Sequence, residues 1–306
     1  MRPPRKATLA LGALALAAPV VADEGFWTFN NPPLALLREA GLSPSPESLD
    51  RIRLSSLRFM DGGSGAFVSK DGLMATNHHV ALECLQNVST KEKDLVAAGF
   101  SAPSRDQEPA CPGYEVNVLV KTEDVTARVL QAVTPEMSDK EAADARKAAS
   151  ARLRNECAAA TGLRCDMVSL YQGGEYHLYG YKAYTDVRLV FAPEQEIAFF
   201  GGDPDNYTYP RHDFDVCFFR AYENGRPAVP PAFLPWSKKG IADGDPVLVS
   251  GSPATSARQN TLAQLTSERE RMRLLAELLA GAATAVERER EIAERAHGNG
   301  KVDPRP

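Results

Sequence analysis

The chain has 306 residues, of which 43% are hydrophobic and 25% are charged. This composition is ordinary for a globular protein and argues against a disordered chain. The formal net charge of −5 argues against nucleic acid or an anionic lipid surface as a partner.

The first residues carry the pattern of a secretory signal peptide. Three basic residues lie among the first six, an apolar stretch runs from Ala7 to Val21, and the small residue Ala22 precedes Asp23. This pattern predicts cleavage near Ala22 and export to the periplasm, the cell surface or the medium. The apolar stretch is shorter than the roughly 20 residues that span a bilayer, and no later stretch is longer. We therefore expect a product without a membrane anchor, with a formal charge of −8 once the three cations are removed.

Two segments before the first histidines have clear patterns. Residues 46–59 begin with a proline and carry apolar residues at helical spacing, which predicts a short helix. Residues 62–77, GGSGAFVSKDGLMATN, form two short apolar runs around a Lys-Asp-Gly turn. This pattern predicts a β-hairpin with His78 and His79 at the end of its second strand.

A strand and a helix are expected next. Residues 114–130 alternate well enough for a strand. Residues 138–162 are rich in alanine, and Ser138 and Glu141 have the spacing of a capping box. Gly162 can close the helix at its C-terminal end.

The second half of the chain carries further strand patterns and then changes character. Residues 175–191 predict a pair of strands because they are rich in tyrosine and β-branched residues. Residues 213–222 and 245–251 predict two more buried strands. After Asn260 a long amphipathic helix is expected. Its apolar residues Leu265, Met272, Leu275 and Leu279 need a surface to pack against, and about ten polar residues follow them.

Five cysteines suit one or two disulfides in an oxidising compartment, and their spacing does not decide the pairing. Cys157 and Cys165 are the nearest pair. No C-x-x-C motif occurs in the sequence, which argues against a zinc or thioredoxin-type site. The five are Cys84, Cys111, Cys157, Cys165 and Cys217.

No metal or cofactor site is predicted. Residues 203–214 begin like a calcium loop but lack the glycine and the glutamate of its sixth and twelfth positions. His78, His79, His212 and Asp213 could gather around a metal ion. However, neighbouring histidines on a strand point to opposite faces and rarely bind one ion together.

The best candidate for chemistry is a histidine in the stretch TNHHV, residues 76–80. Serine peptidases built on β-barrels hold their general base at the end of a buried strand, where the sheet fixes the imidazole. Alignment with that pattern places His79 in the base position. Such a base needs a carboxylate on its other ring nitrogen. Asp215 heads an unbroken apolar run and is preferred over Asp213, which lies two residues earlier on the same predicted face.

A serine nucleophile is harder to find. Trypsin-like enzymes place it in a Gly-x-Ser-Gly turn, whose backbone N–H groups form the oxyanion hole. Ser64 precedes the base in the chain and lies in the first hairpin, and Ser252 lacks the glycine that should follow it. Neither serine meets the geometric requirement.

Several long motifs between Asp23 and Gln264 point to a known family. They include DEGFWTFNNPP, IRLSSLRF, GGSGAFVSKDGLMATNHHV, GGDPDNYTYPRHDFDVCFFRAY and VLVSGSPA. With these motifs in this order, the chain resembles the bacterial dipeptidyl-peptidase 7/11 family of serine exopeptidases.

The resemblance implies a fold that is mainly β with helical insertions. It implies a chymotrypsin-like double β-barrel, of which this chain holds the first barrel and the start of the second, followed by the beginning of a helical capping domain. Residues 1–22 would then be the signal peptide and residues 23–260 the peptidase β-barrel region. Residues 261–306 would be the start of the helical domain and a frayed C-terminal tail. It also implies homodimers of the full-length form and release of dipeptides from peptides with a free N-terminus.

Positions in the family motifs carry over to this chain residue by residue. His79 corresponds to the catalytic base and Asp215 to the triad aspartate, whereas Asn206 and Tyr207 match an Asn-Trp pair that helps hold the substrate's N-terminal end. Tyr207 replaces the usual tryptophan, and SGSPA stands where the family usually has SGHPG. Family members are more than twice as long, and their serine nucleophile, oxyanion hole and specificity pocket lie in the part that this chain lacks.

We therefore expect the N-terminal portion of an exported serine dipeptidyl-peptidase, which supplies the base and its aspartate but no nucleophile and is inactive alone. One alternative is a secreted trypsin-like endopeptidase of the high-temperature-requirement type, which also carries a Thr-Asn-x-His-Val turn. The other alternative is a non-catalytic remnant that binds peptides.

Overall fold

A computed structural model describes residues 26–59, 62–199, 212–252 and 260–298, and the side chains of residue 172 and of residues beyond 282 are not described. The expected signal peptide and the candidate residues Asn206 and Tyr207 lie outside the described residues. Within the described ranges, no helix combines the length and the apolar character that crossing a bilayer requires.

The described strands belong to one ten-stranded sheet, and each pair of neighbours is antiparallel. The order along its main path is β4-β8-β9-β3-β2-β1-β5-β7-β6, and β10 pairs with β9. The strands are β1 (Ser56–Phe59), β2 (Ser64–Phe67), β3 (Leu73–Thr76), β4 (Phe100–Ser101), β5 (Val116–Asp124), β6 (Arg164–Leu170), β7 (Glu175–Tyr184), β8 (Asp186–Ala192), β9 (Cys217–Glu223) and β10 (Arg226–Pro227).

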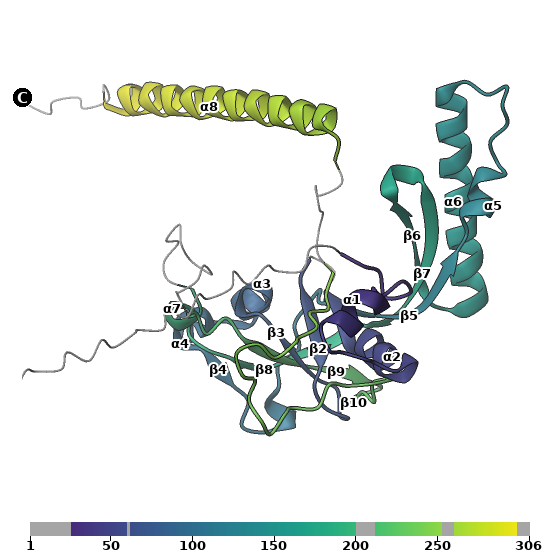
Figure 1. Cartoon of the computed structure of the whole chain (residues 1–306). Coiled ribbons are helices and arrows are strands. Elements are labelled where there is room, and N and C mark those ends of the chain that lie inside the picture. The colour runs from purple at the N-terminus through teal and green to yellow at the C-terminus, as the bar shows by residue number, and fades with distance from the viewer. Residues whose placement is uncertain (1–25, 60–61, 200–211, 253–259, 299–306) are drawn as a thin grey trace, which may run out of the picture.

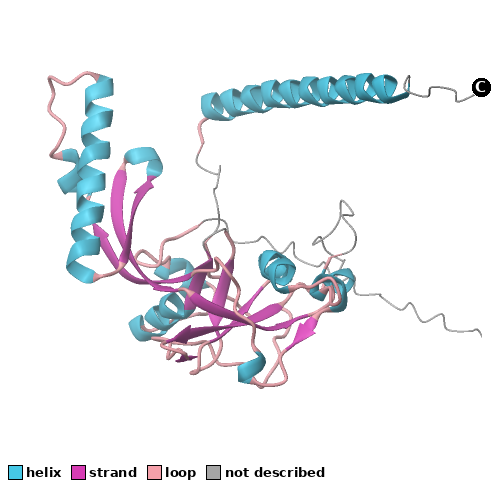
Figure 2. Cartoon of the chain, turned by 180° about the vertical axis from the view of Figure 1, so that it is seen from behind, coloured by secondary structure: helices cyan, strands magenta, loops and turns pink. Residues whose placement is uncertain are grey.

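The sheet curls because one continuous segment supplies both β7 and β8, with only Thr185 between them. Tyr184 at the end of β7 pairs with Val116 of β5, whereas Asp186 at the start of β8 pairs with Tyr222 of β9. The path from β8 to β7 therefore returns to the same point of the chain. Figure 2 shows the strands of the sheet in magenta. Among the described residues no ladder joins β7 to β8, so the sheet is open. The described sheet is therefore mainly antiparallel and not closed, and it does not by itself confirm the first barrel of the double β-barrel that the resemblance implies.

One buried cluster joins the strands of this curl. Phe67, Tyr184 and Phe219 are among its largest members, and the rings of Phe67 and Tyr184 meet edge to face at 5.5 Å. Burial of each large apolar side chain stabilises the fold by about 1.5–3 kcal/mol. This cluster therefore holds β2, β3 and β9 in fixed positions, and those strands lead to the candidate site.

Most helices lie around the sheet, whereas the last one stands apart from it (Figure 1). The α-helices are α1 (Leu34–Glu39), α2 (Pro46–Ser55), α3 (His78–Val88), α4 (Leu95–Ala98), α5 (Thr126–Leu130), α6 (Asp139–Thr161), α7 (Gln195–Ala198) and α8 (Leu262–Gly298), and 3-10 turns span Arg105–Gln107 and Tyr171–Gly173. The long helix expected after Asn260 is confirmed as α8.

The hairpin predicted over residues 62–77 is confirmed as β2 and β3, with Ala66 opposite Ala75. Its turn requires a glycine, because Gly72 has φ +75 and a Cβ atom there would lie 2.8 Å from the Ala221 carbonyl oxygen. The pair of strands expected over residues 175–191 is confirmed as β7 and β8, and the strand expected over residues 213–222 is present as β9 but begins only at Cys217.

Two further boundary predictions were wrong. The helix expected over residues 46–59 ends at Ser55, because the following four residues pair with β2 and β5 as β1. The strand expected over residues 114–130 ends at Asp124, whose carboxylate accepts a hydrogen bond from the Thr126 N–H at 2.9 Å, where α5 begins. In both cases a contact with another element or a local cap overrode the periodic pattern.

The prediction of a strand over residues 245–251 was also wrong. This segment is irregular and exposed, with Val249 93% exposed. Its apolar pattern suits a strand, but a strand forms only where a partner offers a ladder, and none of the described strands does so here.

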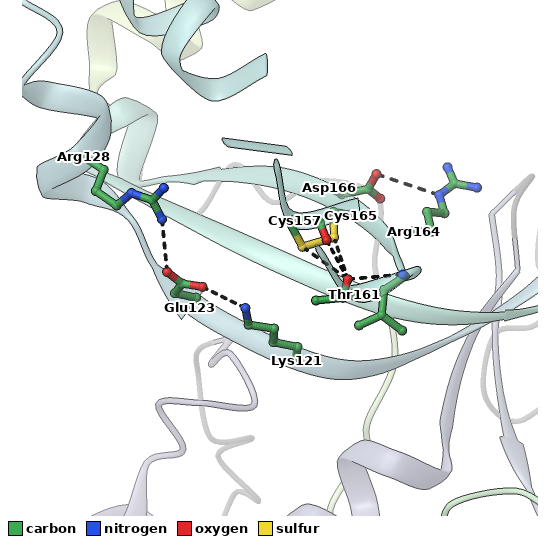
Figure 3. The surroundings of a disulfide bond; sticks show 9 residues. Lys121, Glu123, Arg128, Cys157, Thr161, Arg164, Cys165 and Asp166 are labelled. Carbon is green, nitrogen blue, oxygen red and sulfur yellow. Dashed lines mark hydrogen bonds and ion pairs between the residues drawn. A yellow bond between two sulfur atoms is a disulfide. The ribbon is translucent and has the colours of Figure 1, made fainter. Parts of the chain in front are cut away.

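Helix α6 and the outer parts of β6 and β7 form an arm beside the curled sheet (Figure 1). The predicted capping box is confirmed, since Ser138 and Glu141 bond reciprocally, and Gly162 closes the helix with φ +67. A disulfide joins Cys157 to Cys165 at the base of this arm (Figure 3). The second disulfide joins Cys84 to Cys111, and Cys217 is a buried free thiol.

Candidate active site

The candidate site lies where β3 ends and α3 begins. Thr76 is the last residue of β3, Asn77 is the N-cap, and α3 starts at His78. The histidines therefore occupy the first turn of a helix, not the end of the strand as predicted. The tight turn from strand to helix fixes both side chains relative to the sheet.

The structure brings His79 and Asp215 together. His79 Nδ1 lies 2.7 Å from Asp215 Oδ2, and the His79 backbone N–H donates to Asp215 Oδ1 at 3.0 Å. The side chain of His79 is 56% exposed, whereas that of Asp215 is 11% exposed. The carboxylate is therefore largely shielded and the imidazole reaches solvent.

Sheet register explains why residues 136 positions apart in the chain meet. Thr76 of β3 pairs with Cys217 of β9, so the chain just after β3 faces the chain just before β9. Asp215 was preferred over Asp213 on the sequence, and Asp215 is the residue that contacts the imidazole.

Asn77 is a contact of the site that sequence reasoning missed. Its amide Nδ2 donates to Asp215 Oδ2 at 3.0 Å and to the Asp215 carbonyl oxygen at 3.2 Å. No local pattern signals this contact, because the amide bonds to a residue 138 positions further along the chain.

His78 has a different environment from His79. It is 2% exposed, and burial lowers the pKa of His78, with smaller opposing effects from Asp215 and from a hydrogen bond with Pro193. His78 is therefore a neutral buried side chain next to an exposed one.

Cys217 does not compete as a nucleophile. It is fully buried, and burial, followed by the nearby Asp215 charge, raises the pKa of its thiol well above the ordinary value. The thiolate is the reactive form of cysteine, so this side chain stays protonated and inert.

The two candidate serines contact each other through the irregular segment after β10. The Ser252 N–H donates to Ser64 Oγ at 2.8 Å, and Ser250 Oγ lies 2.8 Å from Ser56 Oγ. Ser64 Oγ is thus engaged by a neighbouring backbone group. Among the described residues, no three His, Cys, Asp or Glu side chains gather as the ligands of a metal ion would.

The arrangement suits proton transfer. A carboxylate only accepts hydrogen bonds, so Nδ1 of His79 carries the proton and Nε2 is the basic nitrogen of this tautomer. A histidine in this tautomer, held by a shielded carboxylate, can take a proton from a hydroxyl and keep the resulting positive charge beside Asp215.

Comparisons with known proteins show which family the chain belongs to. The sequence profile of the Peptidase S46 family matches residues 22–299. An Asp/Glu-specific dipeptidyl-peptidase of Shewanella putrefaciens is 33% identical over 261 residues, which cover 80% of this chain and 35% of that protein. A dipeptidyl-peptidase 7 of Phocaeicola vulgatus is 32% identical over 293 residues, which cover 85% of this chain and 40% of that protein.

Solved structures include a similar fold. The crystal structure of Porphyromonas endodontalis DPP11 in complex with the dipeptide Arg-Glu matches with a TM-score of 0.61 and 27% sequence identity, covering 72% of this chain and 36% of that chain. The chain therefore spans little more than a third of the length of these relatives.

Proposed function

The chain belongs to the Peptidase S46 family, and from this premise we propose that it is the part of a serine-type dipeptidyl-peptidase that carries the general base and its carboxylate. The proposed reaction is release of dipeptides from the free N-termini of peptides. A relative named Asp/Glu-specific dipeptidyl-peptidase and a relative named dipeptidyl-peptidase 7 have almost the same sequence identity to this chain, 33% and 32%. The proposal therefore does not specify which side chains the peptide substrate carries.

The contact between His79 Nδ1 and Asp215 Oδ2 at 2.7 Å carries the proposal. As the serine hydroxyl attacks the peptide carbonyl, His79 Nε2 takes its proton, and Asp215 stabilises the imidazolium that forms. His79 then returns the proton to the leaving amine.

We propose that neither Ser64 nor Ser252 is the nucleophile. Ser64 Oγ accepts a hydrogen bond from the Ser252 N–H, and in sequence Ser252 precedes a proline instead of the glycine that a Gly-x-Ser-Gly turn needs. A fluorophosphonate probe should leave both serines of this chain unlabelled. Labelling of either serine that depends on His79 would contradict this assignment.

A chimera tests the function. The residues of this chain that match the Shewanella putrefaciens relative replace the matching segment of that protein, and the chimera should hydrolyse dipeptidyl arylamides that carry a free amine. His79→Ala should lower kcat about 10⁶-fold and Asp215→Asn about 10⁴-fold. Asn87→Ala, on an exposed position of α3, is the matched control and should leave kcat unchanged.

Two outcomes of this assay would reject the proposal. A folded chimera without activity towards free dipeptidyl arylamides would show that the base and its carboxylate do not serve this reaction. Equal cleavage of acetylated peptides or of unfolded protein would instead favour the endopeptidase alternative, because an exopeptidase requires the free amine.

We also propose that the protein is exported. The pattern of residues 1–22 and the two disulfides support this, because disulfides persist in oxidising compartments. N-terminal sequencing of the exported protein should start at Asp23. Recovery of the protein in the cytoplasm with residues 1–22 still attached would contradict it.

We also propose how the curled sheet and α8 fit into a larger fold. The curled sheet would be the first barrel of a double β-barrel, and α8 would begin a helical capping domain. The return of β7 to β8 through the single residue Thr185 supports the barrel, because it joins two strands that lie next to opposite ends of the strand path.

A further inference from the structure

Asn77 occupies a capping position without capping the helix. It is the N-cap of α3, yet its side chain makes no cap hydrogen bond. Asparagine at an N-cap ordinarily accepts a hydrogen bond from a backbone N–H of the first turn. Here the amide is turned towards Asp215 instead.

Asp215 takes over the capping role from outside the helix. Its Oδ1 accepts the backbone N–H of His79, which is the second residue of α3. The partial positive charge of a helix N-terminus favours a carboxylate at that point. The imidazole and its carboxylate are therefore both held by the same helical turn.

The amide of Asn77 then fixes the second oxygen. Oδ2 accepts from Asn77 Nδ2 at 3.0 Å and from His79 Nδ1 at 2.7 Å. Rotation of a carboxylate about its last torsion is soft, and one bond to Oδ1 alone leaves that rotation open. A donor on Oδ2 that is independent of the imidazole restricts it.

Asn77 also holds the backbone where the sheet ends. The last register pair of β3 and β9 is Thr76 with Cys217, and Asp215 lies two residues before β9 begins. The Asn77 bond to the Asp215 carbonyl oxygen, at 3.2 Å, extends the contact between the two strands beyond the ladder. Both the main chain and the side chain of Asp215 are thus positioned by one amide.

We propose that Asn77 is a positioning residue, which orients the Asp215 carboxylate so that His79 stays in the Nδ1–H tautomer. The value of this role for catalysis rests on the proposed peptidase function. The tautomer itself is a property of this chain and can be observed without any activity.

Nuclear magnetic resonance of the complete chain with ¹⁵N-labelled histidine tests the proposal. The resonances of His79 are assigned with His79→Gln, and Asp215→Asn gives the spectrum of the broken pair. In the wild-type chain His79 should show a protonated Nδ1 with a downfield, exchange-protected proton. The histidines to be distinguished are His78, His79, His177, His212 and His297.

Asn77→Ala should remove the downfield proton and mix the two tautomers of His79, while the far-UV circular dichroism is unchanged. Asn87→Ala makes the same chemical change elsewhere on α3 and should keep the wild-type signal. If Asn77→Ala does not fold, the same measurement is made on Asn77→Ser, because serine is favoured at an N-cap but has no amide. A folded Asn77 variant with the wild-type proton signal and tautomer overturns the proposal. This result would not contradict the proposed peptidase function. Likewise, an inactive chimera would not contradict the role of Asn77.

Discussion

His78 and His79 show how strongly position decides the chemistry of one residue type. The exposed imidazole of His79 contacts a carboxylate, whereas His78 is buried and its Nε2 has no hydrogen-bond partner among the described residues. A neutral side chain buried in this way is tolerated only while it remains neutral.

This difference predicts that His78 makes the stability of the folded chain sensitive to acid. Burial lowers its pKa in the folded state, so below the unfolded value of about 6.5 the unfolded chain binds a proton that the folded chain resists. The stabilising contribution is therefore present above about pH 6.5 and is lost as the pH falls, with a slope of at most about 1.4 kcal/mol per pH unit. Urea unfolding at pH 7 and pH 5 should show a smaller loss for His78→Leu than for the wild-type chain. An equal loss in both proteins would contradict this account.

A buried charge pair predicts a large effect on stability. Arg220 Nε donates to Glu108 Oε1 at 3.0 Å, and the Tyr222 hydroxyl donates to Glu108 Oε2 at 2.7 Å. The Glu108 side chain is 3% exposed. Burial first, and then Glu108, raise the pKa of Tyr222 to about 12, which keeps the phenol a donor.

Arg220→Met would leave the Glu108 carboxylate buried without its cation and should lower the free energy of unfolding by about 3–5 kcal/mol. Arg152→Met is the control, because its pair with Glu156 is exposed at 65% and 51% and is worth less than about 1 kcal/mol. Urea denaturation measures both variants. Equal losses would show that the buried pair is not a stabilising contact.

At the scale of single elements, the ends of helices are set by local chemistry. Helix α6 begins at a reciprocal Ser138–Glu141 capping box and packs Leu153 and Cys157 into a cluster with Val125, Val129 and other residues of the arm. The N-terminus of α3 differs, because its cap comes from Asp215 on another segment.

Ser138→Ala should therefore weaken α6 by about 0.5–2 kcal/mol, since it leaves a first-turn N–H without its acceptor. Lys147→Ala, at an exposed interior position of the same helix, should change stability by less than about 0.5 kcal/mol. Hydrogen exchange of α6 amides measures the local effect. Unchanged protection in Ser138→Ala would mean that the box does not stabilise the helix.

At the scale of the whole molecule, the curled sheet and α8 differ in how their apolar residues are used. The sheet buries its leucines, for example Leu189 at 0% exposure, whereas Leu278 and Leu279 of α8 are 71% and 62% exposed. The described part of α8 lies away from the sheet (Figure 1).

Leucine substitutions should reflect this contrast. Leu189→Ala should lower the free energy of unfolding of the sheet by about 2–5 kcal/mol, because it removes packed core volume. Leu278→Ala and Leu279→Ala should each change it by less than about 0.5 kcal/mol. Denaturation followed by tryptophan fluorescence gives the comparison. A loss above 2 kcal/mol for either α8 variant would indicate that this helix packs on the sheet in solution.

The sequence by itself determined the features that depend on a few neighbouring residues. The hairpin around Gly72, the Ser138–Glu141 box and the Gly162 helix end all follow from motifs whose interactions span short stretches. Motifs also proposed His79 and Asp215 as candidates, and their catalytic roles stay a prediction. Caps, turns and glycine conformations are local, so their energetics can be evaluated from adjacent residues.

Only the tertiary structure decided which distant segments meet. Residues 56–59 became a strand because β2 and β5 offered ladders, and residues 245–251 remained irregular because no described strand did. The pairing of Thr76 with Cys217 brings Asn77 and Asp215 into contact. Strand pairing and burial depend on partners far along the chain, and the pattern within one segment carries no information about which partner it will find.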